Sequence, residues 1–484
     1  MPLTEEERAQ VARLVDAQGD GRKFRDPDFP HARASLAVEL REDVRGWRRP
    51  RKIAEKPQLF VDGISHHDVQ QGRLGDCWFL AAATALAQYP DLIRQVMPED
   101  QPLCGSDYHG IIVARFWRMG HWVSVYIDDK LPIDEDNDLV YGQCTTSNEF
   151  WLPLLEKAFA KFHGNYENIV GGFSSEAFLS LTGFVVEDFY LAEMPARDLH
   201  RLFRCELKNQ SVIACATMTE EDRKGLPGLH AYTVTGVGSL RLGDGLVRLV
   251  RVRNPHATGE WEGAWSDSDP NWNEIDGQKL EELGYEKQDD GQFWIKMSHF
   301  RKHFPEVWLA ARLPDFGDDY ETLARQSFVV SHCWDVGLNA GGSDCSDPKF
   351  LTNPQFTLIV PQRDEPERKS EEDDEESESE EEEIGDIVIQ LIQEQDRSKY
   401  QDLNSIGILI FEVADAEARR LTPALLDGLA PAKGSQPPLT QSSVVARARL
   451  RPGTHIVVPC TGEPDVARRF LLRVYSRKPV TFFS

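Results

Sequence analysis

The sequence predicts an α+β protein with two lobes, one helical and one rich in strands, followed by an antiparallel β-sandwich. A run of leucine and alanine at residues 80–87 has high helix propensity. Residues 230–236 and 246–252 have the apolar patterns of strands. Further on, short β-patterned runs separated by turns are typical of a sandwich. These runs cover residues 327–330, 387–392, 406–413, 454–458 and 470–475.

The composition is typical of a globular protein from a reducing compartment. With 484 residues and 40% hydrophobic content, the chain can bury the cores of two or three domains. Its eight cysteines include no Cys-x-x-Cys pair, which favours free thiols over disulfides or a zinc site. The N-terminus is acidic and no apolar run is long enough to cross a bilayer, so we expect a cytoplasmic protein. The net charge of -26 disfavours nucleic acid as a main partner.

A candidate nucleophile lies where a glycine-rich loop meets the predicted helix. Cys77 follows the loop at residues 71–76 and precedes the helical run. A free thiol has a pKa of about 8.5, and a helix N-terminus or a neighbouring imidazolium lowers it. The sequence therefore predicts that Cys77 is an activated thiolate.

Further residues complete a candidate hydrolytic site. His230 opens one strand-like segment and Asn254 follows the next, so neighbouring strands would hold the imidazole and the amide side by side. The order Cys, His, Asn, with about 150 residues between the first two, matches the papain-type arrangement. There Gln71 is placed to donate its side-chain amide to an oxyanion, together with the Cys77 backbone N–H. A single cysteine or histidine is more often an inert core or surface residue than a catalytic one. The sequence contexts of Cys77, His230 and Asn254, which occur together and in the required order, favour catalysis.

Additional motifs extend along nearly the whole chain. They read FRDPDFP at 24–30, WRRP at 47–50, FVDG at 60–63, NEFWLPLLEKA at 148–158 and DGQFW at 290–294, with others at 340–342, 353–356 and 450–453. With these motifs the sequence resembles the calpain family, the cytosolic cysteine proteases that calcium regulates. The resemblance implies a papain-like two-lobed protease core, a C2-like β-sandwich (calpain domain III), and calcium-dependent endopeptidase activity on protein substrates.

These landmarks predict the domain organisation. Residues 1–24 should hold an N-terminal anchor helix, with Thr4 and Glu7 spaced as a capping box. The lobe with Cys77 (lobe 1) should span residues 25–183, the lobe with His230 and Asn254 (lobe 2) 184–314, and the sandwich 315–484. Many calpains continue into a penta-EF-hand domain where this sequence ends, so we expect an atypical two-module form that binds no penta-EF-hand small subunit.

Much of the negative charge lies in residues 371–383, of which eleven are Asp or Glu. Such a block cannot bury apolar surface and should form a solvated loop. One interpretation is a plain linker. The other, implied by the resemblance, is the acidic loop of calpain sandwiches, which contacts a basic surface of the protease core.

The resemblance also implies one Ca²⁺ site in each lobe, built from the oxygen ligands that calcium prefers. In lobe 1 the matching ligands are the carbonyls of Val61 and Gly63 and the carboxylates of Asp68 and Glu149. In lobe 2 they are Glu260, Asp267, Asp290 and the Gln288 carbonyl, while Gln292 stands where the family has glutamate. From composition alone, the same acids would be solvated loop residues.

A second departure from the family lies beside Asn254. The family segment Asn-Pro-Trp-Gly reads Asn-Pro-His-Ala at residues 254–257. In calpains the tryptophan is a wedge between the lobes without calcium and shields the assembled site, whereas His256 is smaller and polar. This leaves a second interpretation open: a catalytically weak, calpain-like regulatory protein that binds partners, or membranes through its sandwich. Acyl transfer of the transglutaminase kind uses a similar triad, but the calpain motifs do not support it.

Overall fold

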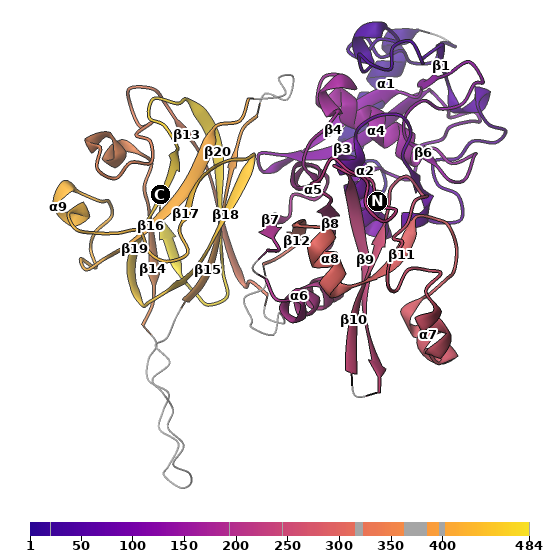
Figure 1. Ribbon diagram of the computed structural model, residues 1–484. Coiled ribbons are helices and arrows are strands. Elements are labelled where there is room, and N and C mark those ends of the chain that lie inside the picture. Colours follow the sequence, from indigo (N-terminus) through magenta and orange to yellow (C-terminus); the bar gives the residue numbers. More distant parts are fainter. Residues whose placement is uncertain are drawn as a thin grey trace, which may run out of the picture. The chain divides into compact units, whose positions relative to one another are not determined.

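The chain folds into two compact units, Met1–Arg312 and the part from Leu313 onward. The structure is a computed structural model (Figure 1) that describes residues 1–19, 21–192, 194–243, 245–314, 323–362, 385–395 and 402–483. The predicted acidic loop at 371–383 lies outside the described residues. The predicted α+β class and the predicted antiparallel sandwich are confirmed.

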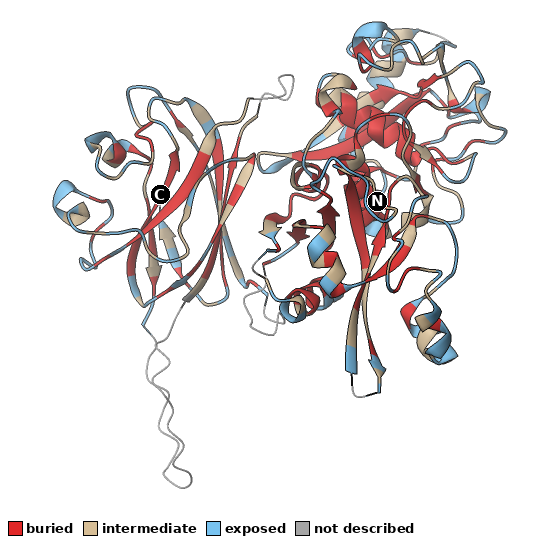
Figure 2. Cartoon of the chain, viewed as in Figure 1, coloured by how far each residue is buried: buried red, intermediate tan, exposed pale blue. Residues whose placement is uncertain are grey.

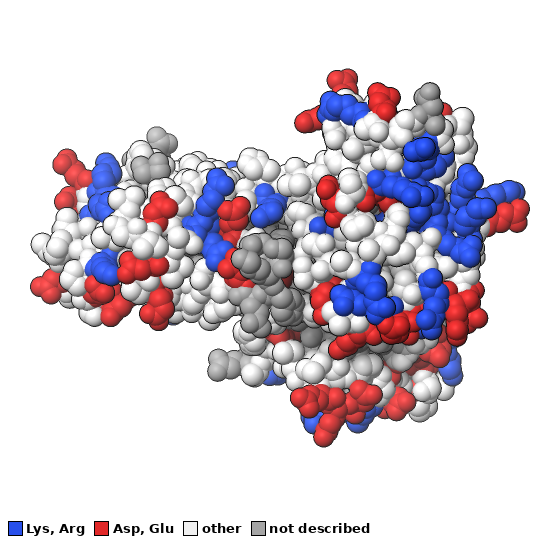
Figure 3. Space-filling model, turned by 90° about the horizontal axis from the view of Figure 1, so that it is seen from above, with Lys and Arg blue, Asp and Glu red and all other residues white. Residues whose placement is uncertain are grey.

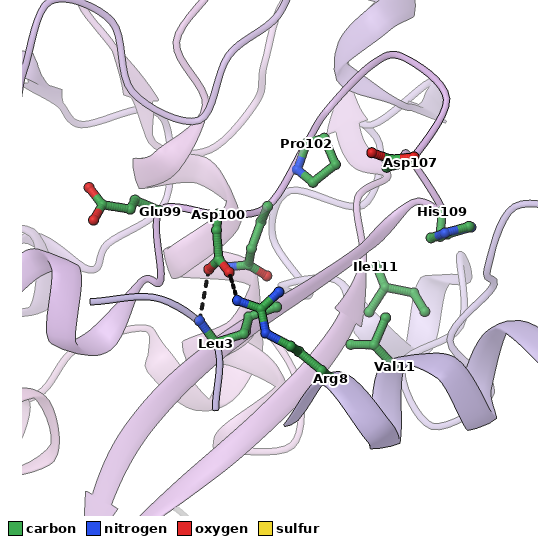
Figure 4. A pocket seen from close by; sticks show the side chains of 10 residues that line it. Leu3, Arg8, Val11, Glu99, Asp100, Pro102, Asp107, His109 and Ile111 are labelled. Atoms are coloured by element: carbon green, nitrogen blue, oxygen red, sulfur yellow. Dashed lines mark hydrogen bonds and ion pairs between the residues drawn. The ribbon is translucent and has the colours of Figure 1, made fainter. Parts of the chain in front are cut away.

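The first helix, α1 (Glu5–Gln18), begins at the predicted capping box. The Thr4 hydroxyl accepts from the Glu7 backbone N–H, and the Glu7 carboxylate accepts from the Thr4 N–H. Figure 4 shows how the start of the helix is tied to the core: Asp100 accepts from the Leu3 N–H at 2.8 Å and pairs with Arg8. Local capping thus sets where the helix begins, and these contacts set where it docks.

Lobe 1 surrounds a helix that is buried on every side. In α2 (Cys77–Ala87) all residues from Trp78 to Ala87 are buried, which fits a helix that is apolar all round. Its small alanine side chains let neighbouring elements approach closely. The other elements are α3 (Pro90–Val96), α4 (Trp151–Phe162), α5 (Ser174–Thr182), β1 (Gly46–Arg48), β2 (Val69–Gln70), β3 (Ile111–Arg118), β4 (His121–Asp128), β5 (Leu131–Ile133) and β6 (Gln143–Cys144).

Lobe 2 is built on one six-stranded sheet in the order β11-β10-β9-β8-β12-β7, with antiparallel neighbours throughout. Its strands are β7 (Val185–Tyr190), β8 (Val212–Ala216), β9 (Ala231–Leu242), β10 (Gly245–Arg253), β11 (Gln292–Lys296) and β12 (Glu306–Ala311), and its helices are α6 (Ala196–Lys208), α7 (Gly277–Leu283) and α8 (Met297–His303). Helix α2 of lobe 1 packs against β8 and β9 (Figure 1). The sheet thereby meets the helix that carries Cys77.

The second unit is an antiparallel β-sandwich, as predicted. One sheet has the order β13-β20-β15-β18 and the other β17-β16-β19-β14-β21. The strands are β13 (Gln326–Trp334), β14 (Phe356–Val360), β15 (Gly385–Gln393), β16 (Ser405–Val413), β17 (Gln436–Thr440), β18 (Ser443–Leu450), β19 (Gly453–Thr461), β20 (Arg468–Ser476) and β21 (Thr481–Phe483), and α9 (Pro423–Leu426) is a short α-helix of this unit. Apolar side chains from both sheets, such as Leu472 and Ile408, form a shared core that Figure 2 shows as buried.

The buried contact of Glu7 predicts how strongly helix α1 is anchored. Burial opposes ionisation, but hydrogen bonds from Arg115, Thr4 and Ser124 lower the pKa of Glu7 to about 2. Arg115 Nε donates to Glu7 Oε1 at 2.7 Å, and both side chains are largely buried. Because a buried charge would lose its partner, Glu7→Gln should lower the free energy of unfolding at pH 7 by about 3 kcal/mol. Calorimetry would measure the loss.

The sign of the pH dependence follows from the lowered pKa. The stabilisation by Glu7 is present above the ordinary pKa of 4.5 and is lost as the pH falls toward 2, so the difference between parent and variant should shrink below pH 4.5. The exposed neighbour Glu6 provides the control, Glu6→Gln. Equal stability losses in the two variants at pH 7 would contradict the assigned anchor.

Candidate active site

Cys77 is the first residue of α2 and follows a loop fixed on both sides. The Arg73 N–H donates to the Val140 carbonyl at 3.0 Å, and the Gly171 N–H donates to the Gly75 carbonyl at 2.8 Å. A Cβ at Gly72 would clash with the backbone of Tyr141, so only glycine allows this close approach. The loop therefore places Cys77, which is partly exposed, at the helix N-terminus, where the sequence predicted it.

The sheet of lobe 2 brings His230 and Asn254 together. His230 precedes β9 and Asn254 follows β10, and these strands are antiparallel neighbours. His230 Nε2 lies 2.8 Å from Asn254 Oδ1. The Asn254 amide donates to the carbonyls of Thr258 and Gly259, at 2.8 and 3.0 Å, which turns its oxygen toward the imidazole. Both side chains are buried.

The two lobes meet beside these groups. The Gln71 backbone N–H of lobe 1 donates to the Pro255 carbonyl of lobe 2 at 2.7 Å. The Thr233 hydroxyl on β9 donates to the Ala81 carbonyl on α2 at 2.6 Å. Within the described residues, no hydrogen bond joins the Cys77 thiol to the His230 imidazole. The lobes are thus in contact, but the candidate nucleophile and base are not hydrogen-bonded.

The protonation state of the pair differs from the sequence prediction of a standing thiolate. Burial raises the pKa of Cys77 to about 11, and the charge of Asp76 adds to this shift. Burial lowers the pKa of His230 to about 4, and neighbouring His256 lowers it further. Thiol and imidazole are both neutral at pH 7, because desolvation outweighs the helix N-terminus and no imidazolium faces the sulfur. In this conformation the raised pKa of Cys77 differs from the predicted activated thiolate.

Two buried carboxyl groups beside the nucleophile were missed by the sequence analysis. Asp76 and Glu156 interact with each other, and burial raises the pKa of both. The Gly142 N–H donates to Glu156 at 2.9 Å. Since the partners are eighty residues apart, no local pattern signals this pair. The pair lies beside the loop that positions Cys77, since Asp76 is the last residue of that loop.

Gln71 makes a contact within the same loop. Its side-chain Nε2 donates to the Leu74 carbonyl at 2.8 Å, while its Oε1 is buried without a hydrogen-bond partner. An amide nitrogen carries two hydrogens, so one donor remains for the predicted oxyanion.

His256 stacks on His230. The ring centroids lie 4.4 Å apart with an angle of 21° between the planes. The His256 backbone N–H also donates to Asn254 Oδ1 at 3.0 Å, the oxygen that faces His230. The residue that departs from the family pattern therefore contacts both candidate catalytic partners.

Two candidate calcium ligands of lobe 1, Glu149 and Asp68, are acids that interact with each other. Burial raises the pKa of Glu149 to about 7, with a further contribution from Asp68 and Asp62, and burial likewise raises the pKa of Asp68. Glu149 Oε1 accepts from the Val61 N–H at 2.9 Å, but its Oε2 is buried without a partner. An unsatisfied buried carboxylate oxygen beside a second acid fits a site for a hard cation. Gly63 lies in the same loop, with a φ of 111°.

In lobe 2, Glu260, Asp267 and Gln288 line one surface hollow. Burial raises the pKa of Glu260 to about 7 and that of Asp267 to about 6, and neighbouring acids add to both shifts. Asp267 Oδ2 is buried without a partner. In the described part of the chain, however, no group of three or more His, Cys, Asp or Glu side chains is arranged to hold a metal ion.

The remaining two candidate ligands contact lobe 1 instead. Asp290 Oδ2 lies 3.2 Å from His67 Nδ1, and Gln292 Oε1 lies 3.1 Å from His66 Nε2. Gln292 also accepts from the Thr235 hydroxyl at 3.0 Å. His66 and His67 directly precede the candidate ligand Asp68, so these contacts link the two candidate calcium sites. Sequence reasoning missed them because the partners are more than two hundred residues apart.

Comparison with known proteins identifies the family. Residues 24–311 match the family model described as "Calpain family cysteine protease". This chain belongs to the calpain family. Residues 330–475 match "Calpain large subunit, domain III", which corresponds to the β-sandwich.

The relatives are calpains from several animals. Calpain-9 of Mus musculus is 34% identical over 95% of this chain and 65% of its own length. Calpain-B of Drosophila melanogaster is 35% identical over 94% of this chain and 50% of its length. The chain thus spans about half to two thirds of these relatives. Among solved structures, a clostridial cysteine protease has a TM-score of 0.19 at 10% identity, covering 90% of this chain and 86% of its own. No helix within the described ranges is long and apolar enough to cross a membrane.

The raised pKa predicts the reactivity of Cys77 toward iodoacetamide. Because only the thiolate reacts, alkylation without calcium should be slow at pH 7.5 and should rise about tenfold per pH unit up to about pH 10. Mass spectrometry of the peptides would give the rate for each cysteine, with exposed Cys104 as an internal reference. A rate at Cys77 that does not change between about pH 6 and 9 would reveal a standing thiolate and refute the neutral pair.

Proposed function

We propose that this calpain is a calcium-dependent intracellular cysteine endopeptidase that performs limited proteolysis through Cys77, His230 and Asn254. The observation that carries the proposal is the orientation of the His230 imidazole by Asn254 next to the helix that presents Cys77. Membership of a cysteine protease family agrees with it. We propose that the enzyme acts on protein substrates in the cytoplasm.

In the proposed reaction, the Cys77 thiolate attacks the carbonyl carbon of a peptide bond. Gln71 and the Cys77 backbone N–H stabilise the oxyanion. As the C–N bond breaks, the His230 imidazolium gives its proton to the leaving amine, and a thioester remains on Cys77. His230 then takes a proton from water, whose hydroxyl attacks the thioester and releases the acid. Asn254 keeps the imidazole oriented throughout.

In the structure, Cys77 and His230 do not form a thiolate–imidazolium pair. To form this pair, His230 has to approach Cys77, which requires a shift of lobe 2 against lobe 1. We propose that the oxygens of Val61, Gly63, Asp68 and Glu149, and those of Glu260, Asp267, Gln288, Asp290 and Gln292, hold calcium. Bound Ca²⁺ would supply the positive charge that these crowded acids lack. For Asp290 and Gln292 this requires release from His67 and His66, which couples ion binding to the contact between lobes.

A second function is favoured by one observation. Burial lowers the pKa of His230 and the stacked His256 lowers it further, which disfavours the imidazolium that catalysis needs. If the pKa of His230 stayed low after calcium binding, the chain would be a catalytically weak regulatory protein. Such a protein would bind partners, or membranes through its sandwich. Proteolysis assays on the purified chain separate the two functions.

The nucleophile is tested by substitution. Cys77→Ala should abolish calcium-dependent hydrolysis of casein, because the thioester of the proposed reaction forms on this sulfur, while the melting temperature should remain that of the parent. Cys104→Ser changes an exposed thiol and should leave the rate unchanged. Retained cleavage by Cys77→Ala would sink the proposed mechanism.

The calcium ligands of lobe 1 are tested by the calcium concentration that gives half-maximal activity. Asp68→Asn or Glu149→Gln should raise this concentration by about tenfold, since each removes one of two anionic ligands. The nearly fully exposed Asp91 provides the control, Asp91→Asn. Site variants that titrate like the parent would show that calcium acts elsewhere.

A further inference from the structure

Lobe 1 has a surface hollow whose lining is rich in cations. Strand β1 pairs with β5, and these strands together with the segments next to them line the hollow. The charged side chains that line it are Arg45, Arg48, Arg49, Lys52 and Lys130, with Asp134 and Glu135. We call this site the basic hollow. Figure 3 shows Lys and Arg gathered over part of the surface of the first unit.

Most of the positive charge in the basic hollow is not neutralised by the protein. Arg49 is paired with Asp129, but Arg45, Arg48 and Lys52 make no ion pair within the described residues. Asp134, in contrast, is already satisfied: it accepts from Arg73 at 3.2 Å and from the N–H groups of Asp136 and Asp138. Three cations are therefore free to meet an anion.

Lys130 lies among both cations and acids. Burial lowers its pKa and the neighbouring Arg25 and Arg49 lower it further, against the opposing charges of Asp128 and Asp129. Residues 22–56 hold eleven Lys and Arg but six Asp and Glu, in a chain of net charge -26. A region of opposite sign on an acidic protein attracts and orients anionic partners.

The basic hollow is connected to the candidate nucleophile. Asp134 on its wall binds Arg73, which lies four residues before Cys77 in the loop that leads to α2. The Arg73 backbone N–H also donates to the carbonyl of Val140. Val140 follows shortly after Asn137, which also lines the hollow. A segment of an extended substrate held in the hollow would therefore lie on the same lobe as the nucleophile and be supported by the same loop.

We propose that the basic hollow docks a carboxylate-rich segment of the protein substrate, outside the residues that are cleaved. The proposal rests on the proposed endopeptidase function and adds a substrate preference to it. A peptide is favoured over a membrane surface because the cations line a concavity, which a narrow chain enters and a flat bilayer does not.

The test uses two peptides with the same cleaved segment, one extended by glutamates and one by glutamines. The double variant Arg48→Glu with Lys52→Glu reverses two exposed cations of the hollow. Its KM for the Glu-extended peptide should rise about fivefold with kcat unchanged, and its KM for the Gln-extended peptide should stay constant. The matched control, Lys433→Glu with Arg477→Glu, reverses two exposed cations of the sandwich and should behave as the parent.

A binding assay separates this proposal from the proposed function. In the Cys77→Ala protein, fluorescence anisotropy should show salt-sensitive binding of the Glu-extended peptide that the Arg48/Lys52 variant weakens about fivefold. If the parent cleaves neither peptide but this binding is present, the endopeptidase function fails and the docking site stands. Equal affinity of hollow variant and control for the Glu-extended peptide would overturn the docking site.

Two other occupants are distinguished in the same assay. If the Glu-extended peptide binds only after the acidic residues of 371–383 are changed to Gln or Asn, the chain's own acidic segment occupies the hollow and the substrate proposal is overturned. If the hollow variant loses binding to phosphatidylserine vesicles but binds the peptide as the parent does, the hollow is a membrane contact, and the proposal is again overturned.

Discussion

The contact between helix α2 and the sheet of lobe 2 is the constraint on which the candidate active site depends. The Thr233 hydroxyl binds the Ala81 carbonyl at 2.6 Å, and the Gln71 N–H binds the Pro255 carbonyl at 2.7 Å. One side of this contact carries Cys77 and the other carries His230. Asn254 belongs to the same sheet as His230, so a movement of the lobes changes the distance between sulfur and imidazole but leaves the histidine–asparagine pair intact.

Burial at this contact explains why the site is uncharged in the structure. The pKa of Cys77 is raised and that of His230 lowered, so the thiol and the imidazole are both neutral. Burial also raises the pKa values of Glu149 and Glu260 in the candidate calcium sites, and neighbouring acids raise them further. Under the proposed function, calcium binding would change both sites. Ions bound at the acids would shift the lobes, and this shift would let Cys77 and His230 form the thiolate–imidazolium pair.

Local signals were sufficient to predict much of the fold. The capping box at Thr4 marks the start of α1, and the short apolar runs of the second unit lie within β13, β15, β16, β19 and β20. The hairpin of β3 and β4 was not predicted in a lobe expected to be mostly helical. Residues 111–117 of β3 are all buried, and a strand buried on both faces lacks the alternation that distinguishes it from a helix.

The candidate site was predictable in its residues but not in its electrostatics. Motif spacing pointed to Cys77, His230 and Asn254, and the structure brings the last two into hydrogen-bond contact. The neutral thiol could not be predicted, because it depends on desolvation where distant segments meet. The same holds for the stacking of His256 on His230, and for the contacts of His66 and His67 with Gln292 and Asp290.

The most direct test of this account is covalent labelling of Cys77 by a peptidyl epoxide as a function of free calcium. Labelling should be negligible in the presence of a chelator, and rapid and confined to Cys77 when calcium is saturating, because only the shifted lobes would form the thiolate–imidazolium pair. Equal labelling rates with chelator and with calcium, or no labelling of Cys77 at saturating calcium, would contradict it.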